Sequence, residues 1–277
     1  VGIENTLIAE SRVAGSSGGG LAASASSTLA AKHGSFLYDA AEMNGGGVYV
    51  EDGAQVAFSE FTHVDSCTSS ASGGGVALTS SATLNTPLLR AQGNVAGLRG
   101  GGMYSSSSAT VSALAIELVE NQAASGGAAY AAEYSSVSCQ SLLAERNSAT
   151  LDGGGAALTT SAALVVSVNG SFISNTAGSD GGGLVIESAG AIHYANGALL
   201  TAVHNRAGAR GGGIAASGSG SLLELHNVTL VGNEADKGGA VALSSTASSQ
   251  MSEHAVAFEH GALSPGGGLH LEGGATA

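Results

Sequence analysis

FISNTAGSDGGGLVIE, residues 172–187, contains the features that decide the fold. An apolar residue is followed three places later by Asn, two places after that by Ala, and then by three glycines and an apolar segment. When every glycine pair of the chain is aligned, the same order returns. We call the residue five or six places before each pair the ladder position, and these residues are Arg12, Asp39, Cys67, Asn94, Asn121, Asn147, Asn175, Asn205, Asn233 and His260.

The repeat has a period of about 28 residues and extends over the whole chain. The residue three places before the ladder position is always apolar, and the residue two places after it is Ala or, once, Ser69. Short segments with period-2 alternation, such as VYV (48–50) and LVI (184–186), follow the glycines and indicate strands. The sequence therefore predicts an all-β, right-handed parallel β-helix over residues 1–277, with about ten coils of 27–28 residues and three short strands per coil.

Glycine and asparagine each have a physical reason in such a coil. At a corner the backbone visits positive φ while the next coil lies directly on top, so a residue without Cβ avoids a clash at every level. Asn tolerates the left-handed conformation, and its amide can bond the Asn one coil away. We therefore expect a structural ladder formed by Asn94, Asn121, Asn147, Asn175, Asn205 and Asn233.

The pairing of FISN with GGGLVI, and more loosely of LVGN with GGAVAL, resembles the repeat of the polymorphic outer membrane proteins, the chlamydia-type autotransporter adhesins. Similar repeats occur in large surface proteins of algae and other microbes. The resemblance extends from end to end of the chain. It implies a secreted, surface-displayed β-helical passenger or stalk without catalysis. Phe stands three places before the ladder position only at Phe36 and Phe172, and the sequence contains no autotransporter barrel.

Composition and charge restrict the function further. The chain has 45 glycines among 277 residues, no Trp and only 4% aromatic residues, so its interior must be thin and built from small side chains. Its formal charge of −13 without a basic cluster excludes a nucleic-acid partner. No apolar run approaches the roughly 20 residues that span a bilayer. We predict an extracellular or cell-surface location.

The two ends are compatible with one another. If the C-terminal end were joined to the N-terminal end, the joined segment would have the length of one further coil. Neither end shows the polar capping coil of an isolated solenoid. We expect the chain to be an uncapped segment of a longer rod, or a unit that stacks head to tail. The alternative is that the chain is a fragment with arbitrary boundaries, whose uncapped ends have no role in stacking.

Candidate chemistry is sparse. Asp152 and Asp180 occupy equivalent places before a glycine triplet, which admits a Ca²⁺ site or a carboxylate pair for glycoside hydrolysis. A solvated file with Arg210 beside Asp180 is the interpretation we favour. The eight His show no metal-ligand spacing, so no catalytic residue, metal or cofactor is predicted.

A strip of small and aromatic residues is expected to face outward after the glycines. Because it is flat and apolar, it indicates lateral packing against a neighbouring rod or domain, or the ordering of water. A cell-surface or matrix ligand is a further expected partner of the chain. Regular Thr ladders, which would favour ice binding, are absent. The predicted lateral-contact residues are Tyr49, Ala77, Tyr104, Ala129, Ala157, Val185 and Ala215.

Cysteines and sequons complete the candidate sites. Cys67 and Cys139 fall in different files and about three coils apart, beyond the roughly 7 Å between Cα atoms that a disulfide spans, so no bridge is expected. Asn169-Gly-Ser171 and Asn227-Val-Thr229 are glycosylation sequons, and each Asn precedes a ladder position by six residues. Both would therefore project from the same edge of the rod, two coils apart.

These observations together predict a non-catalytic, glycosylated, structural or adhesive extracellular rod that associates with copies of itself. The alternative hypothesis is a polysaccharide lyase or hydrolase domain, and the third hypothesis is an ice- or surface-binding solenoid.

Overall fold

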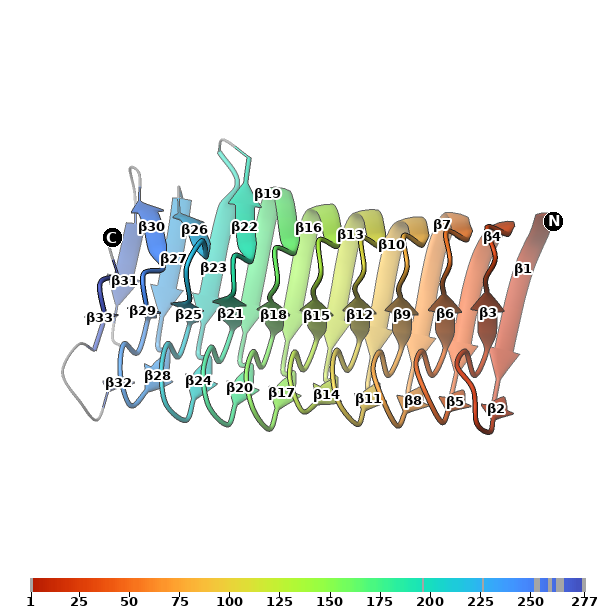
Figure 1. The fold of residues 1–277 in the computed structure, drawn as a ribbon, viewed down its shortest axis with the longest axis horizontal. Helices are drawn as coiled ribbons and strands as arrows, with labels where there is room; N and C mark the ends of the chain where they lie inside the picture. Colours follow the sequence, from red (N-terminus) through yellow and green to blue (C-terminus); the bar gives the residue numbers. More distant parts are fainter. Residues whose placement is uncertain are drawn as a thin grey trace.

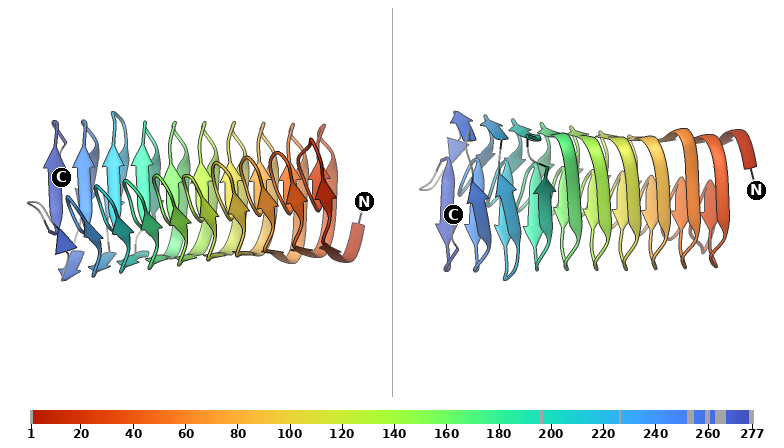
Figure 2. Two further views of the ribbon diagram at one scale, coloured as in Figure 1. Left: turned by 90° about the horizontal axis from the view of Figure 1, so that it is seen from below. Right: turned by 90° about the horizontal axis from the view of Figure 1, so that it is seen from above.

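The computed structural model describes residues 2–275 except 196, 226, 252–254, 259–260 and 263–266. Within these residues the protein is all-β and contains no helix, and its strands form three parallel sheets. The chain winds as a solenoid whose coils stack in a single file along the long axis, with the N- and C-termini at opposite ends (Figure 1, Figure 2). The predicted β-solenoid is confirmed. His260, the last predicted ladder residue, lies outside the described residues.

Sheet A has 13 strands and contains the longest strand of each coil. Its strands are β1 (Gly2–Ala9), β4 (Thr28–Leu37), β7 (Gln55–Asp65), β10 (Thr83–Gln92), β13 (Thr110–Val119), β16 (Ser136–Glu145), β19 (Ala163–Ile173), β22 (Ala191–Tyr194), β23 (Leu199–Val203), β26 (Leu222–Leu225), β27 (Asn227–Val231), β30 (Ser248–Met251) and β31 (Ala255–Phe258).

Sheets B and C have 10 strands each. Sheet B follows the ladder positions and consists of β2 (Arg12–Val13), β5 (Ala40–Ala41), β8 (Thr68–Ser69), β11 (Val95–Ala96), β14 (Gln122–Ala123), β17 (Ser148–Ala149), β20 (Thr176–Ala177), β24 (Arg206–Ala207), β28 (Glu234–Ala235) and β32 (Gly261–Ala262). Sheet C follows the glycines and consists of β3 (Leu21–Ala23), β6 (Val48–Val50), β9 (Val76–Leu78), β12 (Met103–Ser105), β15 (Ala129–Ala131), β18 (Ala156–Leu158), β21 (Leu184–Glu187), β25 (Ile214–Ser217), β29 (Val241–Ser244) and β33 (Leu269–Glu272).

Three strands per coil is correct for most coils, but the strand boundaries differ from the prediction. We expected two short strands between the strand after the glycines and the next ladder position, but they are one continuous strand in the coils from β4 to β19 and separate at β22 and β23, β26 and β27, and β30 and β31. We expected a corner without a strand between the ladder position and the glycines, but this segment contains the two-residue strand of sheet B, such as Thr176–Ala177 within FISNTAGSDGGG. A two-residue strand has no period that sequence alone reveals.

The core is a single thin column. Side chains that alternate along the sheet A strands point inward, so that Val56 packs beside Leu84 and Val111 in the next coils. Phe36 and Phe172 are the largest fully buried side chains. Because the interior is only one side chain deep from each sheet, small residues fill most of it. A small apolar cavity of about 20 Å³ remains beside Met103, Leu142 and Phe172.

The glycine triplets let the backbone of one coil lie against the backbone of others. The first glycine, for example Gly100, has a φ of 63°, a region that costs an L-residue strain. At the second glycine, Gly101, a Cβ would meet the carbonyl oxygens of Gly127 at 2.4 Å and Gln122 at 2.5 Å. Only glycine fits there. The third position faces the Asn file and holds Ala at Ala128 and Ala240.

Candidate functional site

The predicted Asn ladder is present and continuous. All six Asn are fully buried. Five hydrogen bonds join them from coil to coil, each donated by an Nδ2 to the Oδ1 of the following Asn, at 3.0 Å for Asn94 to Asn121, 3.0 Å for Asn121 to Asn147, 2.9 Å for Asn147 to Asn175, 3.0 Å for Asn175 to Asn205 and 3.0 Å for Asn205 to Asn233.

Every hydrogen-bonding site of the four interior ladder amides, those of Asn121, Asn147, Asn175 and Asn205, is used. The Nδ2 of Asn147 donates to Asn175 Oδ1 and to the carbonyl oxygen of Leu118, both at 2.9 Å. Its Oδ1 accepts from the main-chain N–H of Asn121 at 2.8 Å and from Asn121 Nδ2 at 3.0 Å. A buried amide with all its partners stabilises one geometry, because any slip of register leaves donors unpaired. The ladder therefore fixes the register of each coil on the next.

The N-terminal end of the ladder departs from the pattern. Cys67 donates its main-chain N–H to Asn94 Oδ1 at 2.9 Å, and its thiol contacts the carbonyl oxygens of Phe36 and Asp65. Burial raises the pKa of the Cys67 thiol to about 12, which keeps it unreactive. Cys67 and Cys139 are both free and buried, as expected.

Asp39 continues the ladder with a carboxyl group. Its Oδ1 accepts the main-chain N–H of Ser11 at 2.8 Å. Ser11, and not Arg12, is therefore the first ladder residue, because this coil has one more residue before its glycines than we assumed. Asp39 Oδ2 is buried with no hydrogen-bond partner among the described residues. Burial raises the pKa of this carboxyl above its ordinary value.

The predicted outward strip lies on sheet C, with one correction. Tyr104 pairs in register with Tyr130, whereas Ala129 pairs with Met103. The assignment of Ala129 to the strip is therefore wrong. The coil has Ala128 in place of a third glycine, so counting from the glycine pair shifted the register by one. The strip of sheet C reads Ala22, Tyr49, Ala77, Tyr104, Tyr130, Ala157, Val185, Ala215, Ala242 and His270.

Much of this strip is covered by its own surroundings. Ala157, Val185 and Ala215 form a hydrophobic cluster separate from the core, and none of them exposes more than 5% of its surface. The residues before the glycines flank the strip on one side, and the last residues of the sheet C strands flank it on the other. A partner approaching sheet C would therefore touch these flanking side chains first.

Arg210 bridges the two flanks of the strip. Its guanidinium donates to Asp180 Oδ2 at 2.7 Å through Nη2 and at 3.1 Å through Nε, and Nη1 donates to Ser244 Oγ at 3.1 Å. The expected pairing of Arg210 with Asp180 is confirmed, although Asp180 is buried rather than solvated. Sequence reasoning missed Ser244, whose only signal was its place two residues after the outward position of its strand.

Two further carboxylates, those of Asp152 and Glu187, lie near this bridge. Asp152 Oδ1 accepts the main-chain N–H of Asp180 at 3.1 Å. Burial, and then the charges of Asp152 and Asp180, raises the pKa of Glu187. Among the described residues no group of three or more His, Cys, Asp or Glu is arranged to hold a metal ion. Asp180 is held by two donors from Arg210, so it is not placed as the acid of a hydrolytic pair.

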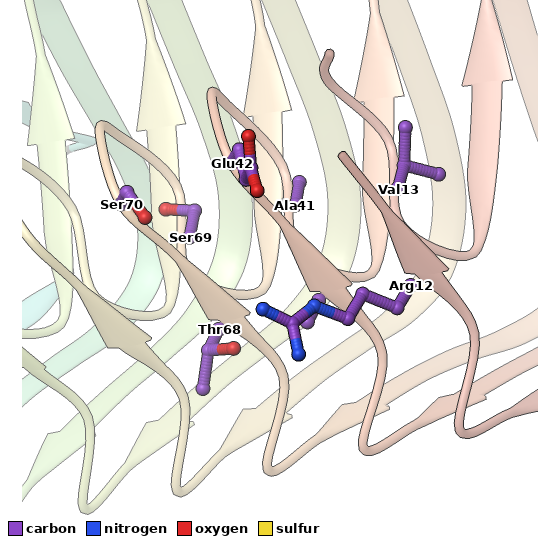
Figure 3. Close-up of a pocket in the computed structure, with 8 residues that line it drawn as sticks. Arg12, Val13, Ala41, Glu42, Thr68, Ser69 and Ser70 are labelled. Atoms are coloured by element: carbon purple, nitrogen blue, oxygen red, sulfur yellow. The ribbon is translucent and has the colours of Figure 1, made fainter. Parts of the chain in front are cut away.

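The outer face of sheet B carries an open depression of about 320 Å³ between Arg12 and Ser70. Figure 3 shows the Arg12 side chain extending toward Thr68, with Glu42 lying apart from it. Glu42 Oε2 accepts the main-chain N–H of Gly15 at 2.7 Å. The arrangement contains one cation, one carboxylate and three hydroxyls, and the carboxylate accepts from the main chain instead of pairing with a base.

The sequons lie on the outer face of sheet A. Asn169, Leu199 and Asn227 are in register on successive coils, which places the two acceptor Asn in one file, two coils apart. Asn169 is exposed and Asn227 is half-buried. Ser141 Oγ donates to Asn169 Oδ1. Their positions agree with the predicted common edge.

Comparison with protein-family models, curated proteins and solved structures found no match to this chain. In the described part of the chain, no helix has the length and apolar character needed to cross a membrane.

Proposed function

We propose that this chain is a rigid, non-catalytic rod segment of an extracellular fibre or surface adhesin. The observation that carries the proposal is the unbroken ladder of six buried Asn side chains, hydrogen-bonded to one another from coil to coil. Such a ladder stabilises regular stacking along one axis, which is the property a stalk or fibre needs. A catalytic domain needs instead a local departure from regularity that gathers reactive groups at one place.

Charged side chains that flank the sheet C strip support a mechanical role. Asp180 is neutralised by Arg210, and Lys237 lies 3.4 Å from Glu272. These pairs join side chains of successive coils and engage the carboxylates of Asp180 and Glu272 with cations. The likeness of the repeat to those of surface adhesins favours the same role and an extracellular place.

Glycosylation belongs to the proposal. Both sequons place the acceptor Asn and the hydroxyl residue on one outward face, because residues two apart on a strand share a side. Glycans on Asn169 and Asn227 would cover the C-terminal half of sheet A and leave the other faces open for contact. This is a feature suited to a hydrated surface rod.

Location and modification are tested on the source cells. Antibodies against the chain should label intact cells, and the native chain should lose mass on enzymatic removal of N-glycans. In a secreted recombinant form, Asn169→Gln and Asn227→Gln should each remove one glycan, while Asn85→Gln, an exposed Asn of sheet A outside any sequon, should remove none. Labelling that appears only after permeabilisation would overturn the extracellular role.

Catalysis is tested with pectin-like and algal polysaccharides. The chain should release neither reducing ends nor unsaturated products. Release that is lost in Asp180→Asn but kept in Asn85→Gln would replace the structural role with the enzymatic alternative.

A further inference from the structure

A ridge of alternating large and small apolar residues runs along one corner of the rod. The corner consists of the turns that join β5 to β6, β8 to β9, β11 to β12, β14 to β15 and β17 to β18 (Figure 1). We call it the corner ridge, and its residues on five successive coils are Met43, Ala71, Leu98, Ala124 and Leu151.

Main-chain hydrogen bonds hold these residues in line. Ala71 N–H donates to Met43 O at 3.1 Å, Leu98 N–H to Ala71 O at 2.8 Å, and Leu151 N–H to Ala124 O at 2.8 Å. In the shorter coil Ser125 N–H donates to Leu98 O at 3.0 Å, and the bridge of Arg99 with Ser125 places Ala124 beside Leu98. The large side chains are exposed, at 49% for Met43, 55% for Leu98 and 54% for Leu151. The coils are about 4.8 Å apart, so the large side chains recur about every 9.6 Å.

The gap between Leu98 and Leu151 is deeper than an Ala side chain alone would make it. The coil from Asn121 to Asn147 has 26 residues, against 27 for the coil before it. The missing residue belongs to this corner, where only Ala124 and Ser125 separate β14 from the glycines. The turn is therefore shorter, and the corner ridge has a notch at Ala124 between two exposed leucines.

This alternation is complementary to itself. If a second copy lies beside the first in the opposite direction, with a twofold axis between the coils of Leu98 and Ala124, each Leu98 faces Ala124 of the other copy. The same axis places Leu151 opposite Ala71. Large side chains then enter gaps along the whole contact, which is how steric zippers gain their packing.

Charges beside the corner ridge favour the antiparallel direction. Arg99 directly follows Leu98 and is exposed, whereas Asp152 directly follows Leu151 and is half-buried. In the antiparallel arrangement Arg99 lies one coil from Asp152 of the other copy, within the reach of an Arg side chain. Opposite charges at the rim set direction and specificity rather than adding much affinity, and here they also offset repulsion between chains of charge −13.

We infer that two copies of this chain associate side by side and antiparallel through the corner ridge. The inference deepens the proposed rod function by naming the surface through which rods contact one another. A contact five coils long is about 20 Å in length, less than a standard interface requires, so single segments should pair weakly. Many rods fixed side by side would pair more strongly, because the effective concentration is then high.

Sedimentation velocity over a concentration series tests the inference. We expect a reversible dimer, and Leu98→Ser with Leu151→Ser should raise its dissociation constant about tenfold or more. The control is Leu114→Ser, since Leu114 on sheet A has the same exposed fraction of 55% as Leu98. It should leave the dissociation constant unchanged.

A variant that fills the notch at Ala124 distinguishes specific dimerisation from unspecific hydrophobic association. Ala124→Leu adds apolar surface, so unspecific association would increase, whereas the corner ridge predicts a loss of dimer because the gap for Leu98 is gone. Circular dichroism and urea midpoints of each variant must match those of the parent chain, which establishes that the coils are intact.

The inference is overturned by a chain that stays monomeric at every concentration, by a dimer that Leu114→Ser weakens as much as the double variant, or by a dimer strengthened by Ala124→Leu. None of these results affects the extracellular rod, which depends on surface labelling and the polysaccharide assays. Labelling only inside cells, with a ridge-dependent dimer in vitro, would instead reject the proposed function and keep the contact.

Discussion

Asn147 sits in the middle of the ladder, and its replacement by Ala tests the ladder's energetic role directly. The substitution removes four hydrogen bonds: two donated by Nδ2 to Asn175 and Leu118, and two accepted by Oδ1 from Asn121. At about 1 kcal/mol net for each bond, the free energy of unfolding should fall by about 4 kcal/mol. The loss is not recovered by water, because the site is buried.

The assay is equilibrium urea unfolding followed by far-ultraviolet circular dichroism at neutral pH. Ser148→Ala is the matched control, since Ser148 is the next residue and is exposed on sheet B. Its effect should stay within about 0.5 kcal/mol.

An isosteric variant separates hydrogen bonding from packing. Asn147→Asp keeps the shape but sets a carboxylate oxygen against two acceptors, Asn175 Oδ1 and Leu118 O. It should be at least as destabilising as Ala at neutral pH, and acidification should restore part of the loss because a protonated carboxyl donates one bond. An Asn147→Ala chain that unfolds within about 1 kcal/mol of the Ser148→Ala control would refute the reasoning.

Three further predictions concern other parts of the coil. Asp39→Asn should raise the free energy of unfolding by about 1 to 3 kcal/mol at neutral pH, because it replaces a buried, unpartnered carboxylate oxygen with a donor. Since the pKa of Asp39 is raised in the folded state, the parent chain gains stability as pH falls through that pKa toward 3.8, and urea titrations over this range should show the advantage of Asp39→Asn shrinking. Gly101→Ala should lower the unfolding free energy by about 3 kcal/mol or more, since its Cβ would meet backbone atoms at 2.4 to 2.6 Å, while Gly102→Ala in the same coil should cost less, since its nearest atoms would lie at 2.9 to 3.1 Å and Ala already occupies the equivalent place at Ala128. Arg210→Ala should lower the thermal midpoint because it leaves the buried Asp180 carboxylate without its cation, and Asp180→Asn in the Arg210→Ala background should restore part of the loss.

Each of these predictions has an outcome that contradicts it. If the stability advantage of Asp39→Asn persisted unchanged in acid, the ionisation of the Asp39 carboxyl would not be the cause of the difference in free energy of unfolding. Equal tolerance of Ala at Gly101 and Gly102 would remove the close backbone approach. A thermal midpoint unchanged in Arg210→Ala would show that Asp180 finds other partners.

The Asn file was predictable because the reason for Asn is local. An amide has two donors and two acceptor sites, and only a stack of identical amides on adjacent coils uses them all in a buried place. The spacing of Asn94, Asn121 and Asn147 was therefore sufficient to indicate the solenoid.

The register errors have one cause. Ser11 and Tyr130 were misassigned because positions were counted from the glycines, and the number of residues between ladder and glycines varies from coil to coil. The register is fixed instead by hydrogen bonds between neighbouring strands, such as that of Ser11 with Asp39, which a single sequence does not display.

The burial of the sheet C strip by its flanking side chains could likewise not be predicted from the sequence. Whether Val185 is exposed depends on how far its flanking side chains reach, and Arg210 spans the strip only because Asp180 and Ser244 stand on opposite sides of it. The corner ridge was missed for a related reason, since Leu98 and Leu151 lie in turns that carry no period.

Distances between spin labels on sheet B test the stacking of coils most directly. Thr68, Thr176 and Glu234 belong to one outward file, with four coil steps from Thr68 to Thr176 and six from Thr68 to Glu234. Replacing them in pairs by labelled cysteines, in a chain with Cys67 and Cys139 changed to Ser, should give mean distances of about 19 Å and about 29 Å by pulsed electron paramagnetic resonance. Equal distances, or a pair at Thr68 and Glu234 closer than the pair at Thr68 and Thr176, would contradict the solenoid.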